Sequence, residues 1–345
     1  MKDALLAQAQ SLGFELCRVA PCGPPPHADA FRRWLAEGRA GEMGWLARNA
    51  DRRTDPQLVL PGARSVVVLA LNYLQPASQP VSLHAPAPQL SRGRIARYAW
   101  GDDYHDLIEK KLALLDQWLT ERGGRQRYYV DTGPILERDY AALAGIGWHG
   151  KSTMLIHPKL GTWFFLAELL TTLEIEPDQP AVDRCGSCTR CITACPTAAI
   201  TGPQQLDARR CVSYLTIELK GSIPLEMRPL IGDRIYGCDD CLEACPWNRF
   251  ARSSQEAAFE ARPFVHGMAL REYLALSEEG FRELFKKSPI KRIKRRGFLR
   301  NVCVALGNVG TEHDLPALQS AALDPEPLIA EHAQWAIEAI TARTR

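Results

Sequence analysis

The sequence contains the run Cys185-Gly186-Ser187-Cys188-Thr189-Arg190-Cys191-Ile192-Thr193-Ala194-Cys195-Pro196, which spaces four cysteines as C-x2-C-x2-C-x3-C-P. In ferredoxins with two clusters, the first three cysteines of such a run bind one cluster and the fourth binds the other. Three thiolates two residues apart can wrap one face of a cubane, and the Cys-Pro pair leads the chain onward. The run therefore predicts a ferredoxin-like module with two [4Fe-4S] clusters.

A second run, Cys238-x2-Cys241-x3-Cys245-Pro246, lacks its first cysteine, because Ile235 occupies that position. Cys211 is the only nearby thiol outside the two runs that can replace the missing ligand. The crossed pattern of two-cluster ferredoxins then assigns the ligands. Cluster one takes Cys185, Cys188, Cys191 and Cys245, and cluster two takes Cys195, Cys211, Cys238 and Cys241.

Zinc is the alternative for these cysteines, because C-x2-C pairs also suit tetrahedral zinc. Zinc does not require this spacing with a proline after both final cysteines, so iron-sulfur clusters are favoured. Disulfides are not expected in a cytosolic chain. Cys17, Cys22 and Cys303 lie outside the pattern and are expected to be ordinary core or surface residues.

The composition is that of an ordinary globular protein of two or three domains, with 345 residues and a formal net charge of +2. The N-terminus shows no signal-peptide pattern, and the longest apolar stretches are far shorter than a membrane span. We therefore expect a cytoplasmic protein without a membrane partner. The charge is too small to indicate nucleic-acid binding by itself.

The chain divides into three expected parts: an α/β or α+β domain at 1–178, the cysteine module at 179–262, and a helical domain at 263–345. In the first part, residues 4–12, 28–36, 104–122 and 136–144 read as helices, and residues 65–71, 127–131 and 153–157 as strands. Residues 74–89 read as a surface loop. In the last part, helices are expected near 269–275, 279–286, 295–306, 314–322 and 327–342, in pairs that resemble HEAT-type hairpins.

A glycine-rich segment, Gly145-Ile146-Gly147-Trp148-His149-Gly150-Lys151-Ser152, satisfies both G-x-G-x-x-G and the Walker pattern. Both motifs require a strand before the loop and a helix after it. Here a helix is expected before the loop and a strand after it. We therefore expect neither nucleotide hydrolysis nor dinucleotide binding.

Nearly the whole chain resembles the epoxyqueuosine reductase family, which completes the modified wobble nucleoside queuosine in tRNA. Besides the first cysteine run, the resemblance rests on the segments 98–105, 130–137, 144–148, 209–216 and 234–241. It implies a nitroreductase-like domain that holds cobalamin, a two-cluster ferredoxin module and a HEAT-like tail. Cobalamin is implied by the resemblance alone, since no D-x-H-x-x-G motif is present.

The resemblance also implies roles for single residues. Asp131 corresponds to the catalytic proton donor, although an Asp before Gly-Pro could also be a turn former. Reducing an epoxide to an alkene removes the oxygen as water, so an acid must protonate it, and a carboxyl buried against the corrin would have a raised pKa. Matching positions near cobalamin are Arg53, Lys151, Leu155, Leu166 and Ser213, and Arg138 matches a position that faces tRNA.

A basic run follows the cysteine module and includes Lys294, Arg295 and Arg296. A solvated helix face is its ordinary meaning, whereas the resemblance favours contact with tRNA phosphates. Two other functions remain open: a cobalamin-dependent reductase of a small molecule, and a non-enzymatic electron carrier. The reductant is expected to be a flavodoxin or ferredoxin type of protein.

Overall fold

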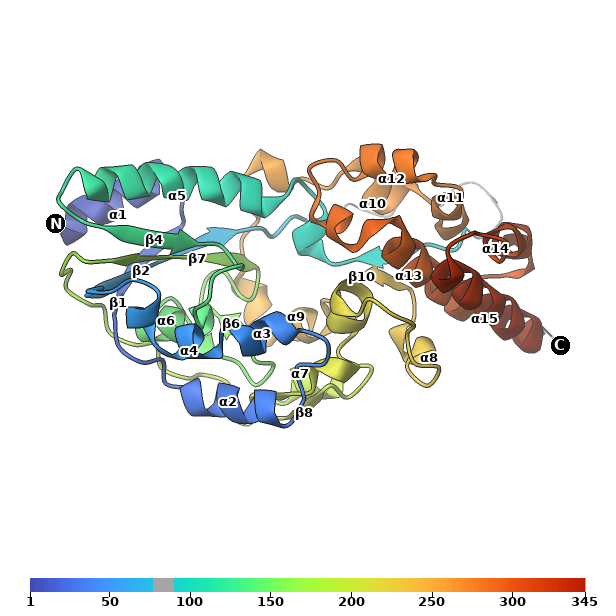
Figure 1. Cartoon of the computed structure of the whole chain (residues 1–345), viewed down its shortest axis with the longest axis horizontal. Coiled ribbons are helices and arrows are strands. Elements are labelled where there is room, and N and C mark those ends of the chain that lie inside the picture. The colour runs from blue at the N-terminus through green and yellow to red at the C-terminus, as the bar shows by residue number, and fades with distance from the viewer. Residues whose placement is uncertain (77–89, 345) are drawn as a thin grey trace.

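The computed structural model describes residues 1–76 and 90–344. Its N-terminal half is built on a four-stranded antiparallel sheet with the strand order β1-β2-β7-β4 (Figure 1). The strands are β1 (Leu16–Pro21), β2 (Ser65–Asn72), β7 (Phe164–Thr171) and β4 (Gln126–Tyr129).

Helices cover both faces of this sheet (Figure 1). Helices α1 (Lys2–Ser11) and α5 (Tyr104–Thr120) share a buried cluster with Val67 and Leu69 of β2. Helix α6 (Glu137–Leu143) shares another with Val66 and Val68. Successive strand residues point to opposite faces, so the continuous apolar run of β2 fills both cores.

The expected elements of this half are present, with ends shifted by a few residues. One shift matters, because β4 ends at Tyr129 and not at residue 131, where the backbone turns. The remaining elements are α2 (Ala28–Ala36), α3 (Gly44–Arg48), α4 (Ala50–Thr54), β3 (Arg94–Ile95), β5 (Trp148–His149), β6 (Leu155–Ile156) and the helical turns η1 (Pro56–Leu58) and η2 (Arg97–Ala99). The loop expected at 74–89 lies mostly outside the described residues.

The cysteine region consists of turns and short elements, as the sequence predicts. They are α7 (Arg190–Thr193), β8 (Ile200–Gly202), β9 (Gln205–Leu206), η3 (Ala208–Arg210), η4 (Tyr214–Glu218), α8 (Arg228–Ile231), β10 (Arg234–Tyr236), α9 (Asp240–Glu243), η5 (Pro246–Phe250) and η6 (Ala257–Phe259). Strand β10 pairs in parallel with β3, so this region is tied to the N-terminal half.

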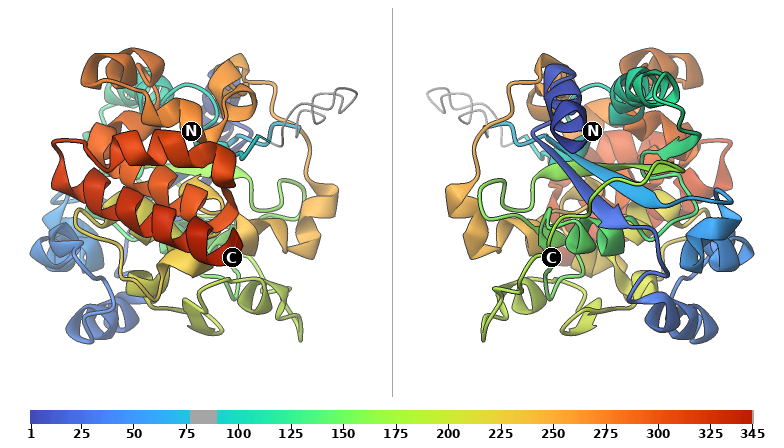
Figure 2. Two further views of the ribbon diagram at one scale, coloured as in Figure 1. Left: turned by 90° about the vertical axis from the view of Figure 1, so that its right-hand side faces the viewer. Right: turned by 90° about the vertical axis from the view of Figure 1, so that its left-hand side faces the viewer.

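The C-terminal part is helical. It comprises α10 (Pro263–Gly267), α11 (Leu270–Leu274), α12 (Glu278–Leu284), η7 (Pro289–Ile293), α13 (Lys294–Val309), η8 (Glu312–Asp314), α14 (Leu315–Ala321) and α15 (Pro327–Thr344). Helix α13 is buried from Gly297 to Gly307, with α15 beside it (Figure 2). A Cβ at Gly307 would lie 2.3 Å from the Trp335 ring, so only glycine permits this close approach.

The hydrophobic cores cross the expected domain boundaries. One cluster joins Ile95 and Trp100 to Tyr236 and to Phe298 of α13. A second brings Leu242 and Phe259 against the sheet and α5. Segments from all three expected parts therefore pack together. None of the described helices has the length and hydropathy needed to span a membrane.

Candidate active site and cluster-binding loops

Asp131 stands at a tight turn just beyond β4. The Thr132 N–H donates to the Val130 carbonyl at 2.6 Å, and Asp131 between them has φ of 59°. This left-handed backbone is unfavourable for a non-glycine residue and is typical of functional sites. The Asp131 side chain is 54% exposed, so its carboxyl is open to solvent on one side.

Two side chains from the start of α5 hold this carboxyl. The Tyr104 hydroxyl donates to Asp131 Oδ2 at 2.7 Å, and His105 Nε2 lies 3.7 Å from the same oxygen. His105 Nδ1 is 2.8 Å from Oδ1 of Asp103, which caps α5. The aspartate thus faces one phenol and one imidazole.

These contacts set the protonation of the pair. Burial tends to raise the pKa of Asp131, but the adjacent His105 and the hydrogen bond from Tyr104 outweigh it, and the pKa is lowered. Burial tends to lower the pKa of His105, but Asp103 and Asp131 raise it to about 9. The pKa expected for Asp131 beneath a corrin was raised. In the protein alone the pKa of Asp131 is lowered instead, and at neutral pH the proton of this pair is on His105.

Two further carboxyls lie near Asp131. Burial, followed by the charge of Asp131, raises the pKa of Glu137 to about 8. Glu168 of β7 is fully buried, and burial raises its pKa well above the ordinary value. Within the described residues, Glu137 Oε1 and both Glu168 oxygens have no hydrogen-bond partner. The site therefore holds two carboxyls beside Asp131 whose pKa values are both raised.

Arg53 is 7% exposed and belongs to α4. Its Nη1 donates to the Ile135 carbonyl at 3.1 Å, whereas its buried Nε has no partner in the described chain. Burial lowers the pKa of this guanidinium, and the charges of Glu137 and Asp131 oppose that shift. Arg53 is thus a buried cation beside the Asp131 turn.

Leu155 and Leu166 contribute to the same hydrophobic cluster beneath α6, and Leu166 is the less buried of the two. Lys151 projects towards the cysteine module, where its Nζ donates to the Gly186 carbonyl at 2.7 Å. The glycine-rich loop follows helix α6 and leads into strands β5 and β6. This order confirms that the loop is not a nucleotide-binding strand-loop-helix.

Ser213 lies beside Gly237, the residue before the second cysteine run. A Cβ at Gly237 would be 3.7 Å from Ser213 Oγ and 2.6 Å from the Ala96 side chain, so these loops pack closely. Tyr98, two residues after Ala96, contacts Tyr104 with ring centroids 6.0 Å apart. A short series of side chains thus connects the second cysteine run with Asp131.

The thiols of the eight cysteines influence one another's pKa within the two expected quartets. Burial and then the neighbouring Cys185, Cys191 and Cys188 raise the pKa of Cys245. For Cys241, burial raises the pKa and the next causes include Cys211, Cys238 and Cys195. Cys17 and Cys303 lie in hydrophobic cores instead.

The four expected tRNA-facing residues differ in their surroundings. Arg138 is exposed and donates to the Thr153 carbonyl at 3.3 Å. Lys294 is exposed, and Arg296 is half-exposed with an ion pair of 3.9 Å to Glu326. Arg295 is only 16% exposed, because it binds Asp324 at 2.6 Å and the Leu276 carbonyl. Arg295 is therefore largely occupied by internal contacts.

Sequence reasoning missed four residues of this site: Tyr104, His105, Glu168 and Arg292. Arg292 pairs with Glu218 at 2.8 Å and also lowers the pKa of Asp131. Tyr104 and His105 were visible only as part of a matching segment. Glu168 carried a signal, since an acidic residue inside an apolar strand is rarely placed there without a role.

Two protein-family models and several known proteins match this chain. The family described as "Epoxyqueuosine reductase QueG, DUF1730" matches residues 53–132, and "4Fe-4S double cluster binding domain" matches residues 184–248. Epoxyqueuosine reductase of Salmonella typhimurium is 42% identical over 94% of this chain and 85% of its own length. The Xanthomonas campestris protein of that name is 42% identical over 95% and 93%. The chain belongs to the epoxyqueuosine reductase family.

Solved structures of this family agree with the fold. A crystal structure of epoxyqueuosine reductase with an epoxyqueuosine-modified tRNA-Tyr stem loop has a TM-score of 0.89 and 34% identity, covering 98% of this chain and 90% of that one. The Streptococcus thermophilus epoxyqueuosine reductase has a TM-score of 0.90 and 29% identity, covering 99% and 90%. As a member of this family, the chain is an oxidoreductase with a module for two [4Fe-4S] clusters.

Proposed function

We propose that this chain reduces epoxyqueuosine to queuosine at the wobble position of tRNA, using cobalamin supplied with electrons by two [4Fe-4S] clusters. The observation that carries the proposal is family membership over nearly the whole chain, combined with an acid site beside the cysteine module. Nucleoside analysis of tRNA treated with the purified protein tests it.

The residues around Asp131 fit cobalamin. The buried Arg53 Nε and Glu137 Oε1 lack partners in the described chain, and corrin carboxamides offer both an acceptor and a donor. Leu155 and Leu166 would lie on the apolar side, with Lys151 and Ser213 at the edge facing the clusters. When bound, cobalamin supplies the electron-transfer chemistry at the epoxide carbon.

The reaction consumes two electrons and two protons, opens the epoxide to an alkene and releases water. Asp131 would donate a proton to the departing oxygen. Since its carboxyl is ionised in the free protein, the proton must come from a neighbour. His105 would be the source, through one bridging water or a closer approach in the substrate complex, because Nε2 lies 3.7 Å from Asp131 Oδ2 and its pKa is about 9. Glu137, with a pKa of about 8, is a second proton reserve.

Electrons would enter at cluster one and leave from cluster two. Cluster two, with Cys195, Cys211, Cys238 and Cys241, would be the inner one, because Gly237 beside Cys238 lies against Tyr98, and Tyr98 contacts Tyr104 of the Asp131 site. Cluster one, with Cys185, Cys188, Cys191 and Cys245, is flanked by the exposed Arg184, Arg190 and Arg249. An acidic flavodoxin or ferredoxin complements such arginines and is the proposed reductant.

The substrate tRNA would lie over the exposed side of the Asp131 carboxyl. Arg138 and the exposed start of α13, with Lys294 and Arg296, offer cations for its phosphates, and Arg295 supports that surface through Asp324. The target base must leave its stack to reach Asp131.

The corresponding division is a nitroreductase-like catalytic part at 1–178, a ferredoxin-like part at 179–262 and a HEAT-like part at 263–345. A cytoplasmic location fits the eleven cysteines, all within the described residues and all free thiols.

A further inference from the structure

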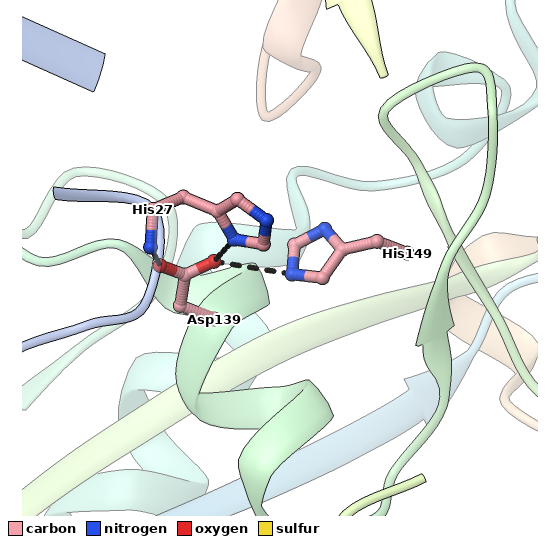
Figure 3. Close-up of side chains that lie close together, drawn as sticks. All are labelled: His27, Asp139 and His149. Carbon is pink, nitrogen blue, oxygen red and sulfur yellow. Dashed lines mark hydrogen bonds and ion pairs between the residues drawn. The ribbon is translucent and has the colours of Figure 1, made fainter. Parts of the chain in front are cut away.

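Figure 3 shows three side chains from separate elements meeting outside the Asp131 site: His27, Asp139 and His149. His27 directly precedes α2, Asp139 belongs to the first turn of α6, and His149 ends β5. None of the three takes part in the proposed reaction. Their arrangement therefore needs its own explanation.

The carboxylate of Asp139 is held in place and directed at both rings. Its Oδ2 accepts from the His27 backbone N–H at 2.8 Å, which leaves Oδ1 facing the imidazoles. His27 Nδ1 lies 2.7 Å and His149 Nε2 lies 3.1 Å from Oδ1. The ring centroids are 4.8 Å apart. One oxygen and two nitrogens thus converge on a small volume.

His149 Nε2 differs from His27 Nδ1, which is hydrogen-bonded to Asp139 Oδ1. The nitrogen is buried and, among the described residues, has no hydrogen-bond partner, because its approach to Oδ1 has the distance but not the direction of a hydrogen bond. A buried ring nitrogen without a partner is costly. A cation between the two rings would satisfy it.

We propose that His27, Asp139 and His149 bind a divalent transition-metal ion, with Zn²⁺ as the best match. Imidazole nitrogen and carboxylate oxygen bind zinc at about 2.0–2.2 Å, so neighbouring ligand atoms of a tetrahedral ion lie roughly 3.3 Å apart. The contacts of 2.7 and 3.1 Å would open by about 0.6 and 0.2 Å, and the two ring nitrogens, which lie within 4.8 Å of each other, would adjust to match.

The site is open to solvent on one side. The Asp139 side chain is 4% exposed and that of His149 18%, whereas that of His27 is 48% exposed. An ion can enter past His27, and water can fill the fourth position. Three protein ligands with one open position is a common zinc arrangement.

The bound ion would connect three segments that are distant in sequence and would stabilise the loop beside cluster one. Lys151 follows His149 by two residues and reaches the Gly186 carbonyl, next to Cys185. We therefore expect the ion to hold these segments together, with water at its open fourth position. The inference does not depend on the proposed function.

The test uses the holoenzyme with all iron sites loaded, so that no free cluster cysteine can bind zinc. After incubation with Zn²⁺ and gel filtration, the parent should retain about one zinc per chain. His27→Gln and His149→Gln should lose it at unchanged iron content, whereas His313→Gln, at an exposed histidine elsewhere, should retain it. X-ray absorption at the zinc edge should show only nitrogen and oxygen ligands.

Two results would overturn the inference. Equal zinc retention in the parent, His27→Gln and His149→Gln would mean that the three residues form a hydrogen-bonded cluster only. A sulfur shell at about 2.3 Å would place the zinc on cysteines. If the His149 variant loads iron poorly, His27→Gln decides, because its side chain is the most exposed of the three.

Discussion

Asp131 combines a left-handed backbone, an exposed carboxyl and a hydrogen bond from Tyr104. If it donates the proton to the epoxide oxygen, Asp131→Asn keeps the shape but offers no acidic proton. Turnover should fall by about 10²- to 10⁴-fold, with tRNA affinity nearly unchanged. The comparison requires matched cobalamin occupancy. Turnover close to that of the parent would remove Asp131 from the mechanism and make Glu137 the next acid to test.

His105 gives the site a pH dependence of known sign. Its pKa is raised from the ordinary 6.5 to about 9, so the imidazolium persists below that pH and is lost as pH rises through about 9. Single-turnover rates at saturating tRNA should decline over this range. In His105→Gln the rate should be lower at neutral pH and the decline centred near 9 should be lost, leaving only the one that Glu137 gives near 8, whereas His313→Gln should keep the parent profile. A decline retained in His105→Gln would assign it to another group.

Single functional residues could be predicted from the sequence where cysteine spacing or the family resemblance identified them. Asp131 and Arg53 came from positions that match the family, and the structure brings the two side chains near each other. The roles of Tyr104 and His105 could not be read, because they depend on where the start of α5 lies relative to the Asp131 turn. That position is set by packing between elements far apart in sequence.

At the scale of elements, the cysteine loops carry the clearest sequence signal. A C-x2-C-x2-C-x3-C-P run fixes a local loop, so its presence is predictable without tertiary information. The assignment of Cys211 as the ligand that replaces a cysteine at Ile235 is harder to predict, because Cys211 lies outside both cysteine runs. In the structure, Cys211 lies close to Cys238 and Cys241, since their thiols affect one another's pKa.

Cys211→Ala tests this ligand directly. The parent should contain about eight iron atoms per chain, and the variant about four, because cluster two loses a ligand and cluster one does not. Cys22→Ala, at a half-buried cysteine outside both quartets, should retain about eight. Unchanged iron content and spectra in Cys211→Ala would return Cys17, Cys22 and Cys303 to consideration.

At the scale of the molecule, the basic run divides into exposed and internal cations, which the sequence could not distinguish. Lys294→Ala with Arg296→Ala should weaken tRNA binding and flatten its salt dependence by roughly 0.7 to 0.9 log-log units for each phosphate that is no longer neutralised. Arg295→Ala should instead lower thermal stability, because it breaks the ion pair with Asp324. Lys110→Ala with Arg122→Ala, at exposed positions in and just after α5, is the control. An unchanged salt slope would show that the run is a solvated face.

The order of the three expected parts was readable from composition and periodicity, but their mutual packing was not. The sequence suggests sharp boundaries near 178 and 262. The structure instead places Ile95, Trp100 and Tyr236 in the core of the C-terminal helices, and Leu242 and Phe259 against α5. Contacts between such distant segments leave no periodic signal in either segment.

The most direct test of the proposed function is conversion by the purified protein. Protein with both clusters and cobalamin loaded is incubated without oxygen with tRNA carrying epoxyqueuosine and a low-potential reductant, and the tRNA is then digested and its nucleosides analysed. We predict that epoxyqueuosine disappears and queuosine, lighter by one oxygen atom, accumulates in proportion to enzyme, while Asp131→Asn at equal cofactor loading gives little product. Unchanged epoxyqueuosine with fully loaded, tRNA-bound parent protein would contradict the proposed function.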